Sequence, residues 1–382
     1  MDINGTCDDR FSAVRDAFAA NFEPGRDPEE VGASVAVTVD GELVVDVWGG
    51  TITNDEGVEA PWQRDTIINV WSTTKTVSAL SMLMLADRGE LDFYSPVAKV
   101  WPEFAANGKA DIEIRHVMSH MAGLAGWREP ITVDDLYDWD KATSLLAAQE
   151  PWWEPGTASG YHAVTQGYLE GEIVRRITGQ TIGEFAAKEI TGPLGADFHI
   201  GTPPECDARV GHVIPPATLL SDVVDRDSLA AQMFRHPTMG AGAANTIPWR
   251  RAEIPAAGGH GNARSVAMIH APMACGGEVN GVRLLSATGA DPVFDEQTYA
   301  KDLVLPLKLR HGIGFGLPSA EMPISPSERA CFWGGWGGSI IVIDLDQRMT
   351  YSYVMNRMGE GTTGDLRGAM PLLATYMALA AG

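Results

Sequence analysis

Residues 72–91 read STTKTVSALSMLMLADRGEL, and this stretch decides the fold prediction. Its apolar residues are spaced as the buried stripe of a helix, at Val77, Leu80, Leu83 and Met84. Gly89 marks the end of the predicted helix. Ser72 and Lys75 stand three residues apart at its start, so they lie on one face, one turn from each other. The lysine amine can therefore reach the serine hydroxyl.

This pair is suited to nucleophilic catalysis. A free serine hydroxyl is a weak nucleophile and needs a neighbouring base. Lys75 can be that base if burial or nearby cations lower its pKa enough to leave it partly neutral. Ser72 also stands near a helix N-terminus, where the helix dipole favours developing negative charge. For the tetrad by itself, the alternative is a solvated helix start with a serine cap.

The composition indicates a large globular protein. With 382 residues and 45% hydrophobic content, the chain can bury an extensive core and divide into two lobes. No stretch is long and apolar enough to span a bilayer. The start, MDINGTCDDRF, lacks the basic and apolar regions of a secretory signal, which predicts a cytoplasmic protein. The scattered cysteines are expected to be free thiols: Cys7, Cys206, Cys275 and Cys331.

The net charge of the chain is −22, from 50 acidic and 28 basic residues. Nucleic acids and anionic membranes bind basic patches. The charge therefore argues against both as partners and indicates an acidic surface.

Strand patterns stand near both ends of the chain. Residues 34–50, SVAVTVDGELVVDVWGG, have apolar positions at period two on either side of Asp40-Gly41, which predicts a hairpin. SIIVIDL and MTYSYVMN, residues 339–345 and 349–356, predict a second hairpin. Helices are expected over residues 11–22, 164–177, 184–190 and 365–381, and an irregular loop over 237–261.

Together these patterns predict an α+β fold. An antiparallel sheet built from both chain ends would be flanked by the terminal helices, with a mainly helical lobe inserted between its halves. We expect residues 1–90 and 285–382 to form the sheet domain, and residues 91–284 to form the helical lobe with irregular loops.

Two further segments carry candidate site residues. Tyr161 lies in PWWEPGTASGYHAVTQGYLEG, residues 151–171, between a turn and a predicted helix. Trp333-Gly334-Gly335 precedes Trp336 and the strand IIVIDL. Glycines packed this densely before a strand let the backbone approach another group closely. Taken alone, the tyrosine could belong to the core or the surface, and the glycines could form a bulge at the sheet edge.

The ordered set of STTK at Ser72, W-x-P-G-T-x-x-G-Y-H at Tyr161 and WGG at Trp333 resembles the serine β-lactamase-like esterases. These are the carboxylesterases of family VIII, related to class C β-lactamases and DD-peptidases. Three more segments resemble family segments: RHVMSHMAGL, AAGGHGNARSVAMIHAPMACGG and HGIGFGL, at 115–124, 256–277 and 311–317. The resemblance runs from about Val35 to Met355 and implies the β-lactamase/transpeptidase-like fold.

The resemblance also implies the roles of the site residues. Ser72 would be the nucleophile, and Lys75 and Tyr161 would share the role of base, without the sequence saying which takes the proton. Attraction to the Lys75 cation is expected to lower the pKa of Tyr161, and burial to lower that of Lys75. The backbone amides of Ser72 and Trp336 would form the oxyanion hole. No metal or organic cofactor is implied. The expected pocket residues are Trp71, Trp153, His162, Trp333, Gly334 and Gly335.

The chain departs from the class C β-lactamase pattern at two motifs. Tyr161-His162-Ala163 replaces Tyr-x-Asn, which removes an amide that contacts β-lactams. Trp333 stands where the lysine of Lys-Thr-Gly faces the carboxylate of penicillins and cephalosporins. An indole in place of a cation makes an anion-binding edge into an apolar wall. We therefore expect hydrolysis of neutral, hydrophobic esters and weak or no activity on β-lactams.

Three functions are weighed for this pattern. The first is a serine carboxylesterase acting on small-molecule esters. The second is an acyltransferase that passes the acyl group to an alcohol or amine acceptor. The third is a catalytically silent, penicillin-binding-like recognition module, against which the intact Ser72, Lys75 and Tyr161 argue. His116 and His120 have a spacing that could chelate a metal, but they lack the glutamate of H-E-x-x-H and a third ligand, so we interpret them as structural.

Overall fold

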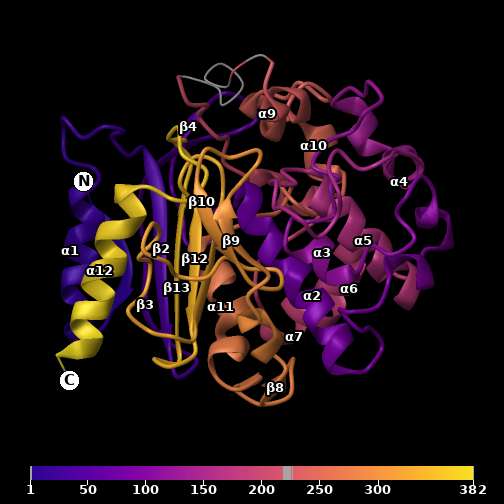
Figure 1. The fold of residues 1–382 in the computed structure, drawn as a ribbon. Coiled ribbons are helices and arrows are strands. Elements are labelled where there is room, and N and C mark those ends of the chain that lie inside the picture. The colour runs from indigo at the N-terminus through magenta and orange to yellow at the C-terminus, as the bar shows by residue number, and fades with distance from the viewer. Residues whose placement is uncertain (1, 218–224, 226, 382) are drawn as a thin grey trace.

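The protein is described by a computed structural model that covers residues 2–217, 225 and 227–381 (Figure 1). Seven strands form one sheet in the order β1-β3-β2-β13-β12-β11, with β4 beside β3 and every pair antiparallel. The strands are β1 (Ile3–Cys7), β2 (Gly32–Val39), β3 (Glu42–Thr53), β4 (Glu59–Pro61), β11 (Ala330–Gly334), β12 (Ile340–Asp344) and β13 (Met349–Met355). The predicted sheet built from both chain ends is confirmed.

The two ends of the chain meet at the centre of the sheet. There β2 pairs with β13, with Val39 opposite Met349 and Ala33 opposite Met355. Both strands are almost fully buried because helices cover both faces of the sheet. At the hairpin between β2 and β3, Asp40 and Gly41 have φ angles of 49° and 84°, which is the left-handed turn that an Asp-Gly pair favours.

Helices lie on the two faces of this sheet (Figure 1). On one face, α1 (Ser12–Ala20) packs against α12 (Leu366–Ala380), so the first and last helices are neighbours. On the other face, α11 (Ala263–Ala274) packs against β2, β12 and β13. Arg10 joins the two ends of the chain further, because its guanidinium donates to the carbonyl oxygens of Ala378 and Leu379.

The remaining helices lie on the α11 side of the sheet (Figure 1). They are α2 (Lys75–Asp87), α3 (Ile114–Met118), α4 (Trp139–Ala148), α5 (Thr165–Thr178), α6 (Ile182–Ala186), α7 (Gly192–Leu194), α9 (Leu229–Met233) and α10 (Ile247–Arg251). Three small two-stranded sheets complete the fold: β5 (Ile68–Asn69) with β6 (His260–Gly261), β7 (Glu278–Val279) with β8 (Val282–Arg283), and β9 (Thr298–Lys301) with β10 (Lys308–His311).

The predicted hairpins and helices are present, with one correction. The stretch 237–261 is expected to be irregular, but it contains a 3-10 helix (Ala241–Asn245), the short helix α10 and strand β6. The Thr246 side chain accepts a hydrogen bond from the backbone N–H of Trp249 and caps the helix, with Pro248 in its first turn. The helix carries Trp249, which is fully buried. Capping and burial of one aromatic residue stabilise a helix too short for a periodic pattern.

The predicted division into a sheet domain and a helical lobe stays a prediction. Its ranges include residues 1, 218–224, 226 and 382, which lie outside the described residues. The helix α11 falls within the predicted lobe, 91–284, yet packs on the sheet. All four cysteines carry free thiols. Of the helices that the structure describes, none has both the length and the apolar character needed to cross a membrane.

Candidate active site

The candidate nucleophile lies in a strained turn that leads into α2. Ser72 belongs to the 3-10 turn Trp71–Thr74, directly before Lys75. Trp71 has a φ angle of 50°, a left-handed conformation that is rare for a bulky residue. Its indole is held between those of Trp249 and Trp336, with ring centroids 5.5 and 5.0 Å away. This packing fixes the backbone that presents Ser72.

Three side chains from different parts of the chain converge at Ser72. The Lys75 amine nitrogen lies 3.1 Å from Ser72 Oγ, and the Tyr161 phenol donates to the same oxygen at 2.6 Å. The amine also donates to the carbonyl oxygens of Ala163 at 2.7 Å and Ala256 at 2.9 Å. These distances lie within the reach required for proton transfer. The structure thus brings together the three residues that the sequence motifs singled out.

Burial sets the ionisation of the two candidate bases. It lowers the pKa of Lys75 to about 7, with the negative charge of Glu170 acting in the opposite direction. It raises the pKa of Tyr161 well above its usual value, although the hydrogen bond to Ser72 acts the other way. The expectation that the Tyr161 pKa would be lowered is therefore wrong, because loss of solvent around the phenol outweighs the hydrogen bonds that act to lower it. The expected lowering for Lys75 is confirmed.

The turn after β11 packs directly against the nucleophile turn. A Cβ on Gly335 would lie 2.3 Å from the Val70 carbonyl oxygen and 2.2 Å from Ser339 Oγ, so only glycine fits there. Ser339 donates to the Val70 carbonyl at 2.8 Å, and its hydroxyl lies 2.9 Å from Thr73 Oγ1. Strand β12 is thereby fastened to the 3-10 turn that carries Ser72.

The two backbone amides expected to form the oxyanion hole are available. Within the described part of the chain, the N–H groups of Ser72 and Trp336 donate no hydrogen bond to another residue. The next residue, Gly337, has its N–H bonded to the Gly361 carbonyl and accepts from Arg367 at 2.9 Å. These bonds at Gly337 fix the turn just after Trp336. The backbone N–H of Trp336 itself remains without an acceptor among the described residues.

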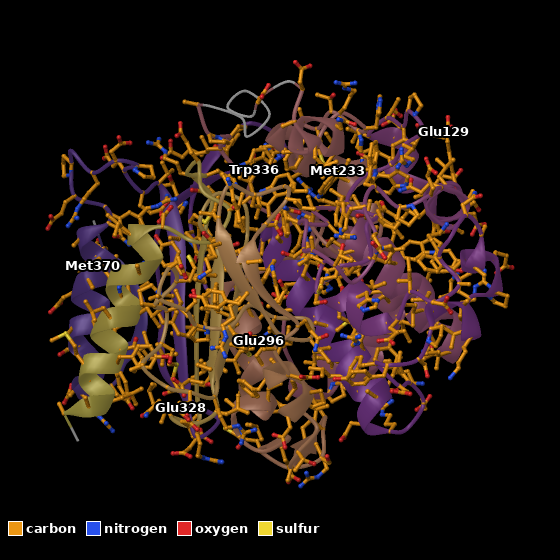
Figure 2. All side chains as sticks on the ribbon, viewed as in Figure 1. Glu129, Met233, Glu296, Glu328, Trp336 and Met370 are labelled. Carbon is orange, nitrogen blue, oxygen red and sulfur yellow. The ribbon has the colours of Figure 1, made fainter. Side chains whose placement is uncertain are left out.

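An apolar cavity of about 100 Å³ opens beside Ser72. Figure 2 labels Met233 and Trp336, which lie near each other at its wall, between the sheet and the helices. Its larger lining side chains are Trp71, Trp127, Tyr161, Met233, Phe234, His236, Met239 and Trp336. None of its lining residues in the described structure is Lys, Arg, Asp or Glu. The buried indole N–H groups of Trp71 and Trp336 have no partner among the described residues.

The predicted pocket residues divide into two groups. Trp71 lines the cavity beside Ser72, whereas Trp333 and Gly334 line a smaller cavity on the other side of Tyr161. The Trp333 ring stacks on His120, with centroids 5.3 Å apart, and lies 5.9 Å from the Tyr161 ring. Gly335 lines neither of these cavities, because it packs against Val70.

His162 and Trp153 also lie outside the lining of both cavities. The ring of His162 is fully buried: its Nε2 accepts from the Leu124 N–H at 3.0 Å, and its Nδ1 lies 2.6 Å from the Gly160 carbonyl. The Trp153 indole donates to Ala158 and packs against Gly160. Both side chains therefore support the loop that carries Tyr161.

The two histidines with metal-chelating spacing have structural partners. His116 Nδ1 accepts from the Glu113 N–H, and His120 Nδ1 accepts from the His162 N–H. Among the residues that the structure describes, no group of three or more His, Cys, Asp or Glu side chains could hold a metal ion.

Several site residues lie in segments without a recognised motif. Trp249 and the cavity residues Met233, Phe234 and Met239 reach the site only through tertiary packing. Glu170 is a buried acid on α5 that acts on Lys75. A charged residue among the apolar positions of a helix, as in GYLEGEIV, was the one signal available for it.

Comparisons with known proteins identify the family and the fold. The family model described as Beta-lactamase matches residues 18–374. A Mycobacterium tuberculosis protein named Esterase/beta-lactamase LipL is 36% identical over 370 residues, which cover 93% of this chain and 83% of that protein. A crystal structure of a family VIII carboxylesterase is 41% identical, with a TM-score of 0.91 over 99% of this chain and all of that one. A penicillin-binding protein homologue from Caulobacter crescentus is 35% identical, with a TM-score of 0.89 and coverage of 99% and 100%.

Proposed function

This chain belongs to the β-lactamase family, and on that premise we propose that it is a serine carboxylesterase that hydrolyses neutral, hydrophobic esters. One observation carries the proposal: the Ser72 hydroxyl lies between the Lys75 amine and the Tyr161 phenol and opens into a cavity without charged side chains among its described lining residues. A carboxylate-bearing substrate would lose its hydration there without gaining a partner. A neutral ester loses little hydration on entering the same cavity.

Lys75 is the base in the proposed mechanism. A neutral amine has two N–H donors, which the carbonyl oxygens of Ala163 and Ala256 accept, and one lone pair that remains for the Ser72 proton. The lowered pKa of Lys75 leaves about half of the amine neutral near pH 7. Tyr161 keeps its proton because its pKa is raised, so it acts as a donor.

Acyl transfer then proceeds in two halves. Ser72 Oγ attacks the ester carbonyl carbon while Lys75 takes the hydroxyl proton, and the backbone N–H groups of Ser72 and Trp336 hold the oxyanion. The departing alkoxide takes a proton from Tyr161, which regains one from the Lys75 ammonium. Water repeats these steps on the acyl-enzyme and releases the carboxylic acid. An alcohol or amine in place of water would give acyl transfer.

The experiment is a panel of p-nitrophenyl esters of increasing acyl length, run beside a chromogenic cephalosporin. Ser72→Ala should remove nearly all esterase activity, and a fluorophosphonate should add its mass at Ser72. Ser81→Ala is the matched control, because Ser81 is buried on the same helix and, within the described structure, its hydroxyl donates only to the Val77 carbonyl. An inactive, unlabelled wild type would favour a silent recognition module.

Adding an alcohol acceptor to the ester assay distinguishes hydrolysis from acyl transfer. A new ester among the products would identify an acyltransferase with the same acyl-enzyme on Ser72. The predicted cytoplasmic location is a separate part of the proposal, and fractionation of cells that express the full chain tests it.

A further inference from the structure

The loop that carries Tyr161 is attached to a segment far away in the sequence. The Tyr161 backbone N–H donates to Asp302 Oδ1 at 2.9 Å, across a separation of 141 residues. The Leu303 N–H donates to the Ser159 carbonyl, also at 2.9 Å. Asp302 and Leu303 directly follow strand β9, so these two bonds fasten the tyrosine loop to the β9–β10 ribbon. The mechanism proposed above gives this attachment no role.

The Asp302 side chain is itself fixed by the turn in which it lies. Its Oδ1 also accepts from the N–H groups of Val304 and Leu305, each at 2.9 Å, and its own N–H donates to the Leu307 carbonyl at 2.9 Å. Asp302 is 3% exposed, and Val304 and Leu305 belong to the apolar cluster that contains Tyr161. The oxygen that meets Tyr161 is therefore held in place in a dry environment.

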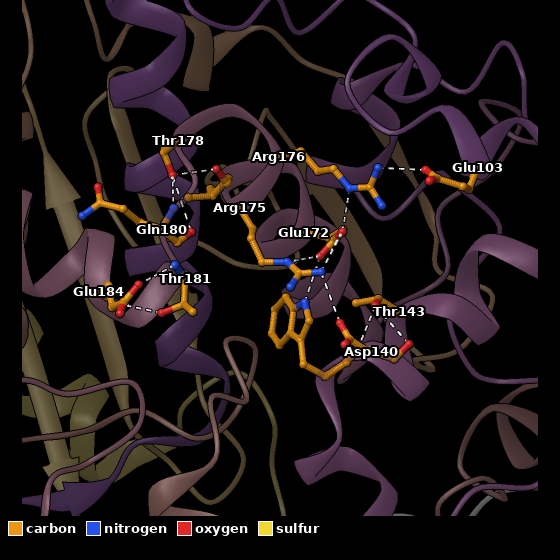
Figure 3. Close-up of polar contacts among 12 residues, drawn as sticks. Glu103, Asp140, Thr143, Glu172, Arg175, Arg176, Thr178, Gln180, Thr181 and Glu184 are labelled. Atoms are coloured by element: carbon orange, nitrogen blue, oxygen red, sulfur yellow. Dashed lines mark hydrogen bonds and ion pairs between the residues drawn. The ribbon is translucent and has the colours of Figure 1, made fainter.

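Another buried acid, Glu172 on α5, is held by cations instead. It pairs with Arg175 and Arg176 and accepts from the Trp139 indole (Figure 3). Asp302, by contrast, binds only backbone N–H groups among the described residues. It supplies an acceptor oxygen at a fixed place, and the oxygen of a neutral amide could replace it.

The neighbouring N–H groups of the tyrosine loop are held from the opposite direction. Gly160 donates to the His120 carbonyl at 3.0 Å, and the His162 N–H donates to His120 Nδ1 at 3.1 Å. His120 lies just after α3, on the helical side. Asp302 is thus the anchor of the loop on the ribbon side. Without it, the buried Tyr161 N–H would have no acceptor, and the loop would have to move to find one.

We propose that Asp302 is a positioning residue for acyl transfer, which holds the Tyr161 phenol where it can give its proton to the departing alkoxide. This inference rests on the proposed function. The phenol lies 2.6 Å from Ser72 Oγ, and a displacement of about 1 Å can cost about 10²-fold in rate. Burial is the largest cause of the raised pKa of Tyr161, and the charge of Asp302 is a lesser one. Asp302 therefore contributes position more than charge.

The test compares two esters that share an acyl group and differ in the leaving group. p-Nitrophenolate is a stable anion that departs without a proton, whereas an alkoxide needs the proton of Tyr161. We measure kcat/KM, because it reports only the steps up to release of the alcohol. Asp302→Ala should lower kcat/KM about 10²-fold for an ethyl ester and less than about fivefold for the p-nitrophenyl ester.

Two further variants separate the position of the acceptor from its charge. Asp302→Asn keeps the acceptor oxygen without the charge, so the ratio of the two kcat/KM values should stay within about twofold of wild type. Asp302→Glu keeps the charge but moves the acceptor by one methylene, so the ratio should shift in the same direction as in the alanine variant. If Asp302→Ala does not fold, the comparison of these two variants decides.

A double-mutant cycle shows whether Asp302 acts through Tyr161. Tyr161→Phe removes the phenol and should produce the same dependence on the leaving group. Adding Asp302→Ala to Tyr161→Phe should cost little more for the ethyl ester, because the two residues act as one unit. Losses that simply add would contradict the inference.

Asp344→Ala is the matched control. Asp344 is also buried and accepts a backbone N–H in a turn, that of Gln347, at the opposite end of β12 from the turn that contains Trp336. This variant should lose thermal stability and keep the wild-type ratio. The inference is overturned if folded Asp302→Ala lowers both kcat/KM values equally, if Asp302→Asn is as impaired as Asp302→Glu, or if Asp344→Ala shifts the ratio as much.

Hydrogen exchange at the Tyr161 amide gives a readout that needs no activity. The amide should exchange faster in Asp302→Ala and Asp302→Glu than in wild type, Asp302→Asn or Asp344→Ala. Unchanged exchange in folded Asp302→Ala would overturn the inference. A wild type that hydrolyses neither ester would contradict the proposed function instead, and the exchange rates would still show whether Asp302 holds the tyrosine loop.

Discussion

Lys75 should determine how the activity depends on pH. Because the neutral Lys75 amine is the proposed base and burial lowers its pKa to about 7, kcat/KM should fall as the pH drops below that value. Well below it, each pH unit should reduce kcat/KM about tenfold, since only the remaining neutral fraction reacts. Steady-state kinetics from pH 5 to pH 9 measure this limb. A flat profile down to pH 5 would contradict the assignment of Lys75 as the base.

Trp333 should favour neutral substrates. Its indole lies 5.9 Å from the Tyr161 ring and lines the smaller cavity beside it, where a cation would attract carboxylates. We expect Trp333→Lys to lower activity on neutral esters and to increase affinity for cephalosporins. The variant should also lose several kcal/mol of stability, because Trp333 is only 8% exposed and the new charge would have no partner. Ester kinetics, cephalosporin binding and thermal unfolding measure the three effects. A wild type that hydrolyses cephalosporins as readily as short esters would refute this role.

Residues that react are easier to find in a sequence than residues that support them. Ser72, Lys75 and Tyr161 stand in motifs with fixed spacing, and the structure brings them together. Trp249 and Glu170 reach the site through tertiary packing, and nothing in their local spacing indicates where they will lie. Burial of the Tyr161 phenol likewise depends on the whole fold, so the direction of its pKa shift was not predictable from one neighbouring charge.

At the level of elements, the contact between the turn after β11 and the turn before α2 should control the proposed oxyanion hole. Gly335→Ala should lower kcat by about 10²-fold, because the added methyl would meet the Val70 carbonyl and push the Trp336 amide out of position. The affinity for substrate should change little. Kinetics together with circular dichroism would separate this effect from unfolding.

The chain offers a matched control for this substitution. Among the described residues, no atom would lie within 4 Å of a Cβ on Gly242, so Gly242→Ala should leave both kcat and stability unchanged. Wild-type kcat in a folded Gly335→Ala protein would argue against an oxyanion hole at Trp336.

Elements with a strong local signal were predictable from sequence. The Asp40-Gly41 hairpin and the long helices have clear turns and periodic apolar residues. Strand β1 was not predicted, because its middle residues are exposed at the sheet edge and show no buried period. Of strand β11, the sequence indicates only the WGG motif at its end. Its five residues, ACFWG, are all buried and show no alternation that would predict a strand. Edge position and burial on both faces are properties of the assembled sheet.

At the level of the whole molecule, buried histidines should make the fold sensitive to acid. Burial lowers the pKa of five histidines well below the usual value of 6.5: His120, His162, His260, His270 and His311. Below pH 6.5 the unfolded chain therefore binds protons that the folded chain does not. The stability that these residues contribute is present above pH 6.5 and is lost as the pH falls toward about 4.

Two buried glutamates act in the opposite direction, because burial raises the pKa of Glu30 to about 7 and that of Glu170 well above its usual value. As the pH falls, the five histidines lead the unfolded chain to bind more protons, and the two glutamates lead the folded chain to bind more. The unfolded chain therefore binds about three protons more than the folded chain, and the free energy of unfolding should fall by about 4 kcal/mol per pH unit at the steepest point. Urea titrations between pH 7 and pH 4.5 measure this slope. His270→Met should reduce the slope by about 1.4 kcal/mol per pH unit, and a free energy that stays constant over this range would disprove the argument.

The pairing of β2 with β13 also has a consequence for biosynthesis. A ribosome that has finished Val39 must add some three hundred residues before Met349, its partner in the sheet, is made. At about 5–20 residues per second, this delay lasts roughly 15–60 seconds. During that time β2 and β3 form a ribbon with one open edge, which is a template for pairing with other nascent chains. We therefore expect the emerging protein to depend on protection by chaperones, and messages truncated before Met349 to yield aggregates.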